Sequence, residues 1–86
     1  TQEEKKIIFS KFALPKVLKR IGLLQGEIVL TGEGLDELIE QYKNTSGIRD
    51  LEQAAEHLAA NALYQIEVDH VKQVVFDAEM VKKLFA

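Results

Sequence analysis

The 86 residues of the chain are enough for one small domain, which at this length needs well-placed apolar residues to form a core of its own. Hydrophobic residues make up 47% of the sequence, a share that favours a packed domain and argues against a disordered segment. The absence of cysteine excludes disulfides, thiol catalysis and cysteine-ligated metals, and the net charge of −3 disfavours nucleic-acid binding by the domain as a whole.

A helix is predicted to begin at the first residue, because Thr1 and Glu4 have the spacing of a capping box. The apolar stripe of this helix comprises Ile8, Phe9, Phe12 and Ala13. Pro15 lacks a backbone donor and disfavours helix at Leu14, so we expect the helix to end there. A second, short helix then starts at Pro15 and closes at Gly22. Its apolar face is formed by Val17, Leu18 and Ile21.

Two short β-prone runs, at residues 28–30 and 74–76, are each followed by a residue that can cap a helix. Thr31 precedes a helix whose apolar stripe is formed by Leu35, Leu38, Ile39 and Tyr42. Asp77 precedes the last helix, whose stripe is formed by Met80, Val81, Leu84 and Phe85. We expect the two strands to pair with each other, because a lone strand leaves its backbone groups unsatisfied. The long helical crossover between them favours parallel pairing.

Residues 44–47 are expected to end the helix that follows Thr31, and a long helix begins after them at Ile48. Its apolar stripe is formed by Ile48, Leu51, Ala55, Leu58, Ala62 and Ile66. Three further alanines allow a neighbouring helix to approach closely, namely Ala54, Ala59 and Ala60. The predicted fold class is therefore mostly α, a bundle of about four to five helices with a short two-stranded parallel β patch, in one domain that covers residues 1–86.

Charge is distributed unevenly along the chain. The first 20 residues carry a net charge of +4, from six lysines and arginines against Glu3 and Glu4, and the remainder carries −7. A solvated helix face is the first interpretation of the basic segment, and a docking surface for an acidic neighbour is the second. No apolar run approaches the roughly 20 residues that cross a bilayer, so we expect no membrane partner and a cytoplasmic location.

No complete catalytic site and no metal site are predicted within the chain. Gly32 and Gly34 are not followed by the lysine that a phosphate-binding loop requires. The acidic residues are expected mostly on exposed faces, which argues against a carboxylate pair for acid–base catalysis. His57 and His70 have no further ligand at a metal-binding spacing and are interpreted as surface histidines. Neither Ser10 nor Ser46 has a neighbouring base that would activate its hydroxyl group.

Arg49 breaks a local rule, because it lies in the first turn of the long helix, where the helix dipole disfavours a cation. On one interpretation, Arg49 points into water or pairs with Asp50, Glu52 or Gln53. On the other, a bound anion such as phosphate lies opposite both the helix N-terminus and the guanidinium group. The residues themselves leave both interpretations open.

Several segments at consistent spacing resemble the small helical domain of Lon proteases. Residues 1–8 and 14–16 are similar to that family's Tyr-Thr-x-x-Glu-Lys-x-x-Ile run and the Leu/Ile-Pro-Lys step that follows it. Residues 42–52 resemble its Tyr-Thr-x-Glu-Ala-Gly-Val-Arg-x-Leu-Glu-Arg motif. Residues 74–76 and Leu84 resemble its closing strand and helix, so the resemblance covers essentially the whole chain.

The resemblance implies the small subdomain, or lid, of an AAA+ ATPase module fused to a Ser-Lys peptidase. It implies that Arg49 is the sensor-2 arginine, which reaches the nucleotide phosphates, and that Ile48 and Ile8 border the adenine. The implied cofactor is ATP, with Mg²⁺ held by the large AAA+ subdomain. The implied partners are that subdomain, the peptidase domain, further copies in a homo-oligomeric ring, and protein substrates. The parent would be an ATP-dependent serine endopeptidase, and this chain alone would hold none of its catalytic groups.

The sequence departs from the family's pattern at three positions. Gln53 stands where the family usually has a second arginine, and Ala60 and Asn61 stand where basic residues are common. Because the first residue is Thr1 and not a methionine, we expect the chain to be a piece of a longer one.

Two other interpretations compete with the AAA+ lid. A histone-fold-like interaction module would use the long central helix and its flanking strands to bind a partner chain, but Gly47 interrupts that pattern. A helix-turn-helix DNA reader at residues 35–63 would place Arg49 beside Asp50 and Glu52, where acidic groups oppose contact with phosphate. Both fit the residues less well than the lid does.

Overall fold

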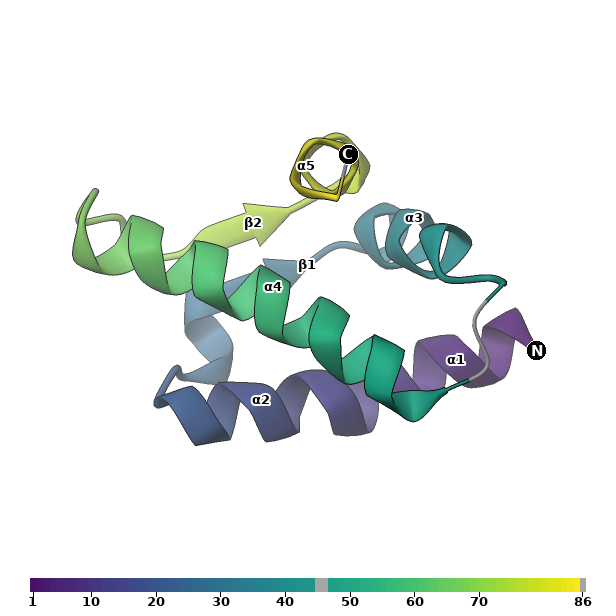
Figure 1. Ribbon diagram of the computed structural model, residues 1–86. Coiled ribbons are helices and arrows are strands. Elements are labelled where there is room, and N and C mark those ends of the chain that lie inside the picture. The colour runs from purple at the N-terminus through teal and green to yellow at the C-terminus, as the bar shows by residue number, and fades with distance from the viewer. Residues whose placement is uncertain (45–46, 86) are drawn as a thin grey trace.

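Two strands that lie far apart in the sequence meet near the middle of the molecule (Figure 1). In the computed structural model, which describes residues 1–44 and 47–85, β1 (Ile28–Leu30) pairs in parallel with β2 (Val74–Phe76). Ile28 is opposite Val74 and Leu30 is opposite Phe76. The predicted parallel pair is confirmed, and so is the mostly helical class with a small β patch. The two strands thus pair with each other within one chain.

The longest helix, α4 (Ile48–Glu67), runs across the front of the molecule in Figure 1 and contributes much of the core. Its buried residues are Leu51, Ala54, Ala55, Leu58, Ala59 and Ala62. The small alanine side chains let α4 lie close against the N-terminal helical segments. The predicted stripe is confirmed from Leu51 onward. It is wrong at Ile48, which is 59% exposed because it faces a surface groove instead of the core.

The first quarter of the chain, from Gln2 to Ile21, is helical without a break. It consists of α1 (Gln2–Ile8), the π-helical turn η1 (Phe9–Ala13) and α2 (Leu14–Ile21). The capping box at Thr1 and Glu4 is confirmed, as is the close of α2 at Gly22, which has a left-handed backbone (φ 84°). The predicted end of the first helix at Leu14 is wrong, since the Leu14 N–H donates to the Phe9 carbonyl and carries the helix onward. The wider π turn accommodates the missing donor and the ring of Pro15, which then lies in the first turn of α2.

The π turn changes which side chains of this segment reach the core. Phe9 and Ala13 are buried as predicted and Ile8 is half-buried against the core. Phe12 is 65% exposed, so its predicted place on the core stripe is wrong. A π turn holds one residue more than an α turn, and a residue three positions after Phe9 therefore no longer returns to the same face.

Each strand leads directly into a capped helix, as predicted. The Thr31 hydroxyl accepts a hydrogen bond from the Gly34 N–H at the start of α3 (Gly32–Gln41). An Asp77 carboxylate oxygen accepts one from the Met80 N–H at the start of α5 (Ala78–Leu84). The helices α3 and α5 lie side by side on the far side of the strand pair from α2 (Figure 1). A 3₁₀ turn, η2 (Gln25–Glu27), joins α2 to β1.

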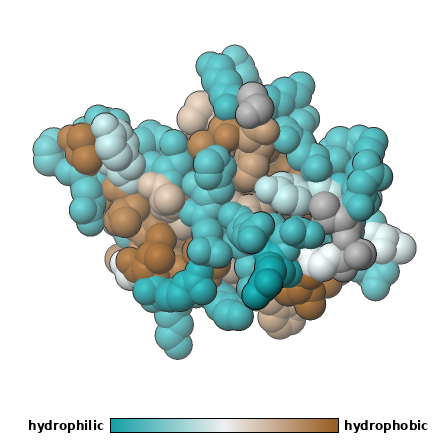
Figure 2. Space-filling model, viewed as in Figure 1, coloured by the Kyte–Doolittle hydropathy of each residue, from teal (hydrophilic) through white to brown (hydrophobic). Residues whose placement is uncertain are grey.

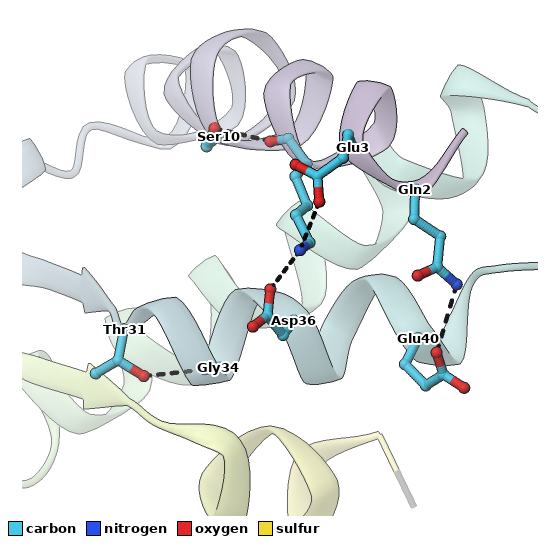
Figure 3. Close-up of polar contacts among 8 residues, drawn as sticks. Gln2, Glu3, Ser10, Thr31, Gly34, Asp36 and Glu40 are labelled. Carbon is cyan, nitrogen blue, oxygen red and sulfur yellow. Dashed lines mark hydrogen bonds and ion pairs between the residues drawn. The ribbon is translucent and has the colours of Figure 1, made fainter.

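Ion pairs join the basic N-terminal segment to acidic residues elsewhere in the chain. The Lys6 ammonium group lies 2.7 Å from Asp36 on α3 and 3.2 Å from Glu3, and Figure 3 shows both carboxylates facing the gap between α1 and α3. Lys16 pairs with an acidic residue of α4 at 2.7 Å, and Arg20 pairs with another at 3.3 Å. Three of the six basic residues of this segment thus pair with acidic residues elsewhere in the chain. No helix within residues 1–44 and 47–85 is long and apolar enough to cross a membrane.

Candidate functional site

Arg49 lies at the beginning of α4, one residue after Ile48. The N-cap residue of this helix is Gly47, which has no side chain to accept hydrogen bonds from the first-turn N–H groups. Arg49 is exposed, and its guanidinium group makes no hydrogen bond or ion pair within the described ranges 1–44 and 47–85. Exposure to water is one half of the first interpretation of this arginine, and the structure agrees with it; the other half, pairing with Asp50, Glu52 or Gln53, is not seen among the described residues. The charged side chain of Arg49 is thus unpaired among the described residues, and it lies at a helix start that has no side-chain cap.

A groove of about 290 Å³ lies beside Arg49, between η1 and the first turns of α4. Its lining residues are Ile8, Phe12, Ala13, Lys16, Ile48 and Glu52. Figure 2 shows hydrophobic atoms at the surface below the beginning of α4, although most of the face in that view is hydrophilic. The groove is therefore a local apolar surface of a size suited to a flat ring system and not part of a broad hydrophobic face.

The structure brings together the residues that the sequence singled out. Ile8 and Ile48 line the same groove from opposite sides, although they belong to helices far apart in the chain. Ile48 and Glu52 share one face of α4 because they are four residues apart, and Arg49 lies on the neighbouring face. Sequence reasoning missed Phe12 and Lys16 as groove residues. The basic charge of Lys16 could have identified it as a surface residue. Phe12 was assigned to the core by its α-helical spacing, because the sequence does not reveal the π turn that brings it to the surface.

The charged groups of the groove are mutually neutralised. The Lys16 ammonium group donates to Oε2 of Glu52 over 2.7 Å. This hydrogen bond and the charge of Lys16 hold the pKa of the Glu52 carboxyl below its ordinary value, with smaller contributions from Arg20 and Arg49. The groove therefore presents apolar walls and a closed ion pair, while the positive charge of Arg49 beside it is available to an anion.

The other candidates for chemistry have structural partners. His57 is exposed, as predicted, but its Nε2 atom lies 3.0 Å from the Leu84 carbonyl oxygen and its ring packs edge-on against Phe85. The Ser10 hydroxyl donates to the Lys6 carbonyl oxygen over 2.7 Å, a helix contact and not an activated nucleophile. Ser46 lies outside the described residues.

Among residues 1–44 and 47–85, no group of three or more histidine or acidic side chains is placed to hold a metal ion. His70 lies in the exposed loop that precedes β2, with a positive φ of 60°. Gln53 and Ala60, where the Lon pattern has basic residues, line a shallow hollow on α4 together with Glu56 and His57. That surface carries no lysine or arginine among its lining residues.

No protein-family model matches the chain. Its sequence is similar to the Lon protease of Finegoldia magna, which is 30% identical over 83 residues, and to Lon protease 1 of Sorangium cellulosum, 30% identical over 79 residues. The Lon protease of Wolbachia pipientis is 36% identical over 74 residues. These alignments cover 96%, 92% and 86% of the chain but only 11%, 10% and 9% of the relatives. The chain thus spans about a tenth of the length of the curated relatives it matches.

Proposed function

Since this chain belongs to the Lon protease family, we propose that it is the nucleotide-sensing lid of an AAA+ ATPase module within an ATP-dependent protease. One observation carries the proposal: Ile8 and Ile48 line one apolar groove, and the unpaired guanidinium group of Arg49 follows Ile48 directly. A nucleotide has the same two parts, a flat apolar base and a polyanionic tail. The apolar groove fits the base, and Arg49 fits the polyanionic tail.

In this proposal the residues of the chain divide the work of binding. Ile8 and Ile48 hold the base between two helical segments, and Arg49 donates hydrogen bonds to a phosphate oxygen pair through its planar fork. The uncapped N–H groups at the start of α4 add a favourable field for the phosphates. When bound, ATP supplies the free energy of its hydrolysis, and Mg²⁺ is held by the large AAA+ subdomain.

The packing of the module suits it to move as one body when the nucleotide changes. The start of α4 carries Ile48 and Arg49, and the same helix is joined to α2 by the Lys16–Glu52 and Arg20–Glu56 ion pairs and by its buried alanines. A displacement of the start of α4 therefore moves the core with it. In the parent, this motion is coupled to a peptidase domain and to neighbouring copies in a ring, and it drives the unfolding of protein substrates.

A photoaffinity experiment on the full-length parent tests where the nucleotide binds. With 8-azido-ATP as the probe, labelled peptides mapped by mass spectrometry should include residues 8–16 or 47–52, and excess ATP should abolish that label. An ATP-protected label found only outside these two segments would contradict the assignment of the groove. The label reports on the base end of the nucleotide, and therefore does not depend on whether hydrolysis occurs.

A further inference from the structure

The Lys5 side chain ties α1 to the end of α3. Its ammonium group donates hydrogen bonds to the carbonyl oxygens of Tyr42, over 2.9 Å, and of Lys43, over 3.1 Å. Carbonyl groups at the end of a helix have no partner within it, and a cation there also complements the helix dipole. The last turn of α3, residues 38–41, contains no lysine or arginine of its own. Lys5 thus caps α3 from α1, which lies alongside it (Figure 3).

The capped residue Tyr42 lies against the beginning of α4. Tyr42 and Gln53 of α4 line the same surface hollow, so the tyrosine side chain borders the first turns of that helix. Burial, and after it the charge of Asp50, raise the pKa of the Tyr42 hydroxyl above its ordinary value. Asp50 is the residue after Arg49. The end of α3 that Lys5 holds is therefore in contact with the turn that carries Arg49.

We propose that Lys5 is a positioning residue for Arg49: by capping α3, it sets where the first turn of α4 lies and where the guanidinium group meets the nucleotide phosphates. The inference rests on the proposed function, because it needs a phosphate beside Arg49. Residues 44–47 are all that separates Lys43 from the beginning of α4, so the chain itself also connects the cap to the arginine. A misplacement of about 1 Å is enough to cost a positioned group much of its effect on a reaction.

The test is a double-mutant cycle on ATP turnover by the full-length parent, with Lys5→Met and Arg49→Ala. Methionine keeps an unbranched apolar side chain but cannot donate to the two carbonyl oxygens. Lys5→Met should lower kcat by about three- to tenfold and leave KM for ATP within about twofold, because the misplaced guanidinium group acts mainly in the transition state. In the Arg49→Ala background the same substitution should change kcat by less than about twofold, since no guanidinium group is left to position.

Lys6→Met is the matched control. Lys6 is the neighbouring lysine of α1 and also bridges to α3, but its ammonium group pairs with the carboxylates of Asp36 and Glu3 and not with the end of the helix. Its substitution should leave kcat within about twofold of wild type. A loss as large as that of Lys5→Met would show that any weakened contact between α1 and α3 slows turnover, and would overturn the inference.

The cycle separates a positioning role from a general defect in folding, because a folding defect lowers kcat in both backgrounds. If Lys5→Met lowers kcat equally with and without Arg49, Lys5 is structural and the inference is wrong. If Arg49→Ala lowers kcat while Lys5→Met leaves it unchanged, the positioning role is refuted and the proposed function stands. If Arg49→Ala itself leaves kcat unchanged, the proposed function fails, and the inference fails with it.

Discussion

The ammonium group of Lys16 on α2 lies 2.7 Å from Oε2 of Glu52 on α4, across the end of the groove that Ile48 also lines. This pair joins the two helices at the place where the proposed base site begins. Arg49, on the neighbouring face of α4, has no described carboxylate within ion-pair distance. The pair therefore bears on both the stability and the charge of the site.

Glu52→Gln should make the chain less stable at neutral pH, and the difference from wild type should vanish in acid. Lys16 lowers the folded-state pKa of the Glu52 carboxyl, so its contribution is fully present above the unfolded-state pKa. It is lost as the pH falls through the folded-state pKa, where wild-type Glu52 is also neutral. Melting temperatures of both proteins at pH 7 and pH 3 measure this.

The control for this prediction is the double-mutant cycle with Lys16→Met. Lys16→Met should reproduce the loss at neutral pH, and the double variant should lose little more than either single variant. Equal melting temperatures for wild type and Glu52→Gln at pH 7 would show that the pair contributes nothing.

Gly34→Ala should destabilise the chain by about 1–3 kcal/mol, because the new methyl group would overpack a closed contact. A Cβ atom at Gly34 would lie 2.4 Å from the Phe76 carbonyl oxygen and 3.1 Å from Leu30 Cδ1. Gly32→Ala is the matched control in the same helical turn, since nothing lies within 4 Å of a Cβ atom there. It should be neutral or slightly stabilising. Urea unfolding measures both, and equal effects would contradict the close approach of α3 to β2.

Leu58→Ala should cost about 2–5 kcal/mol in the free energy of unfolding, because Leu58 is fully buried in the middle of α4. That is a large part of the stability of so small a domain. Leu24, which is 71% exposed, is the matched leucine, and Leu24→Ala should change stability by less than about 0.5 kcal/mol. A change of less than about 0.5 kcal/mol for Leu58→Ala would mean that α4 faces the other way.

The local signals in the sequence were sufficient for most of the fold. The caps at Thr31 and Asp77 and the β-prone runs before them predicted where α3 and α5 begin, because capping depends on adjacent residues. The parallel pairing followed from the long crossover. The apolar stripe of α4 was right wherever the helix packs against other elements of the chain.

The errors at Phe12 and at Ile48 have different causes. An α-helical repeat placed Phe12 in the core, but the π turn before Pro15 adds a residue to the turn and brings it to the surface. Ile48 continued the stripe of α4 in phase, but its side chain lines the groove and is 59% exposed, whereas Leu51 in the same turn is buried. Phe12 and Ile48 both line the groove, which no local pattern predicts because it forms between two distant segments. Ile21, expected on the apolar face of α2, is also exposed (36%) and lies outside the groove.

ATP turnover by the full-length parent tests the role of Arg49 most directly. A guanidinium group bonded to phosphate is worth about 1.5–3 kcal/mol, so Arg49→Ala should slow hydrolysis by about tenfold or more if the contact strengthens in the transition state. Arg49→Lys should rescue poorly, because lysine lacks the planar fork. The stability of the 86-residue chain should change by less than about 0.5 kcal/mol, since Arg49 is exposed. Wild-type turnover in the Arg49→Ala parent, together with a loss of stability in the chain, would show that Arg49 is structural and contradict the account.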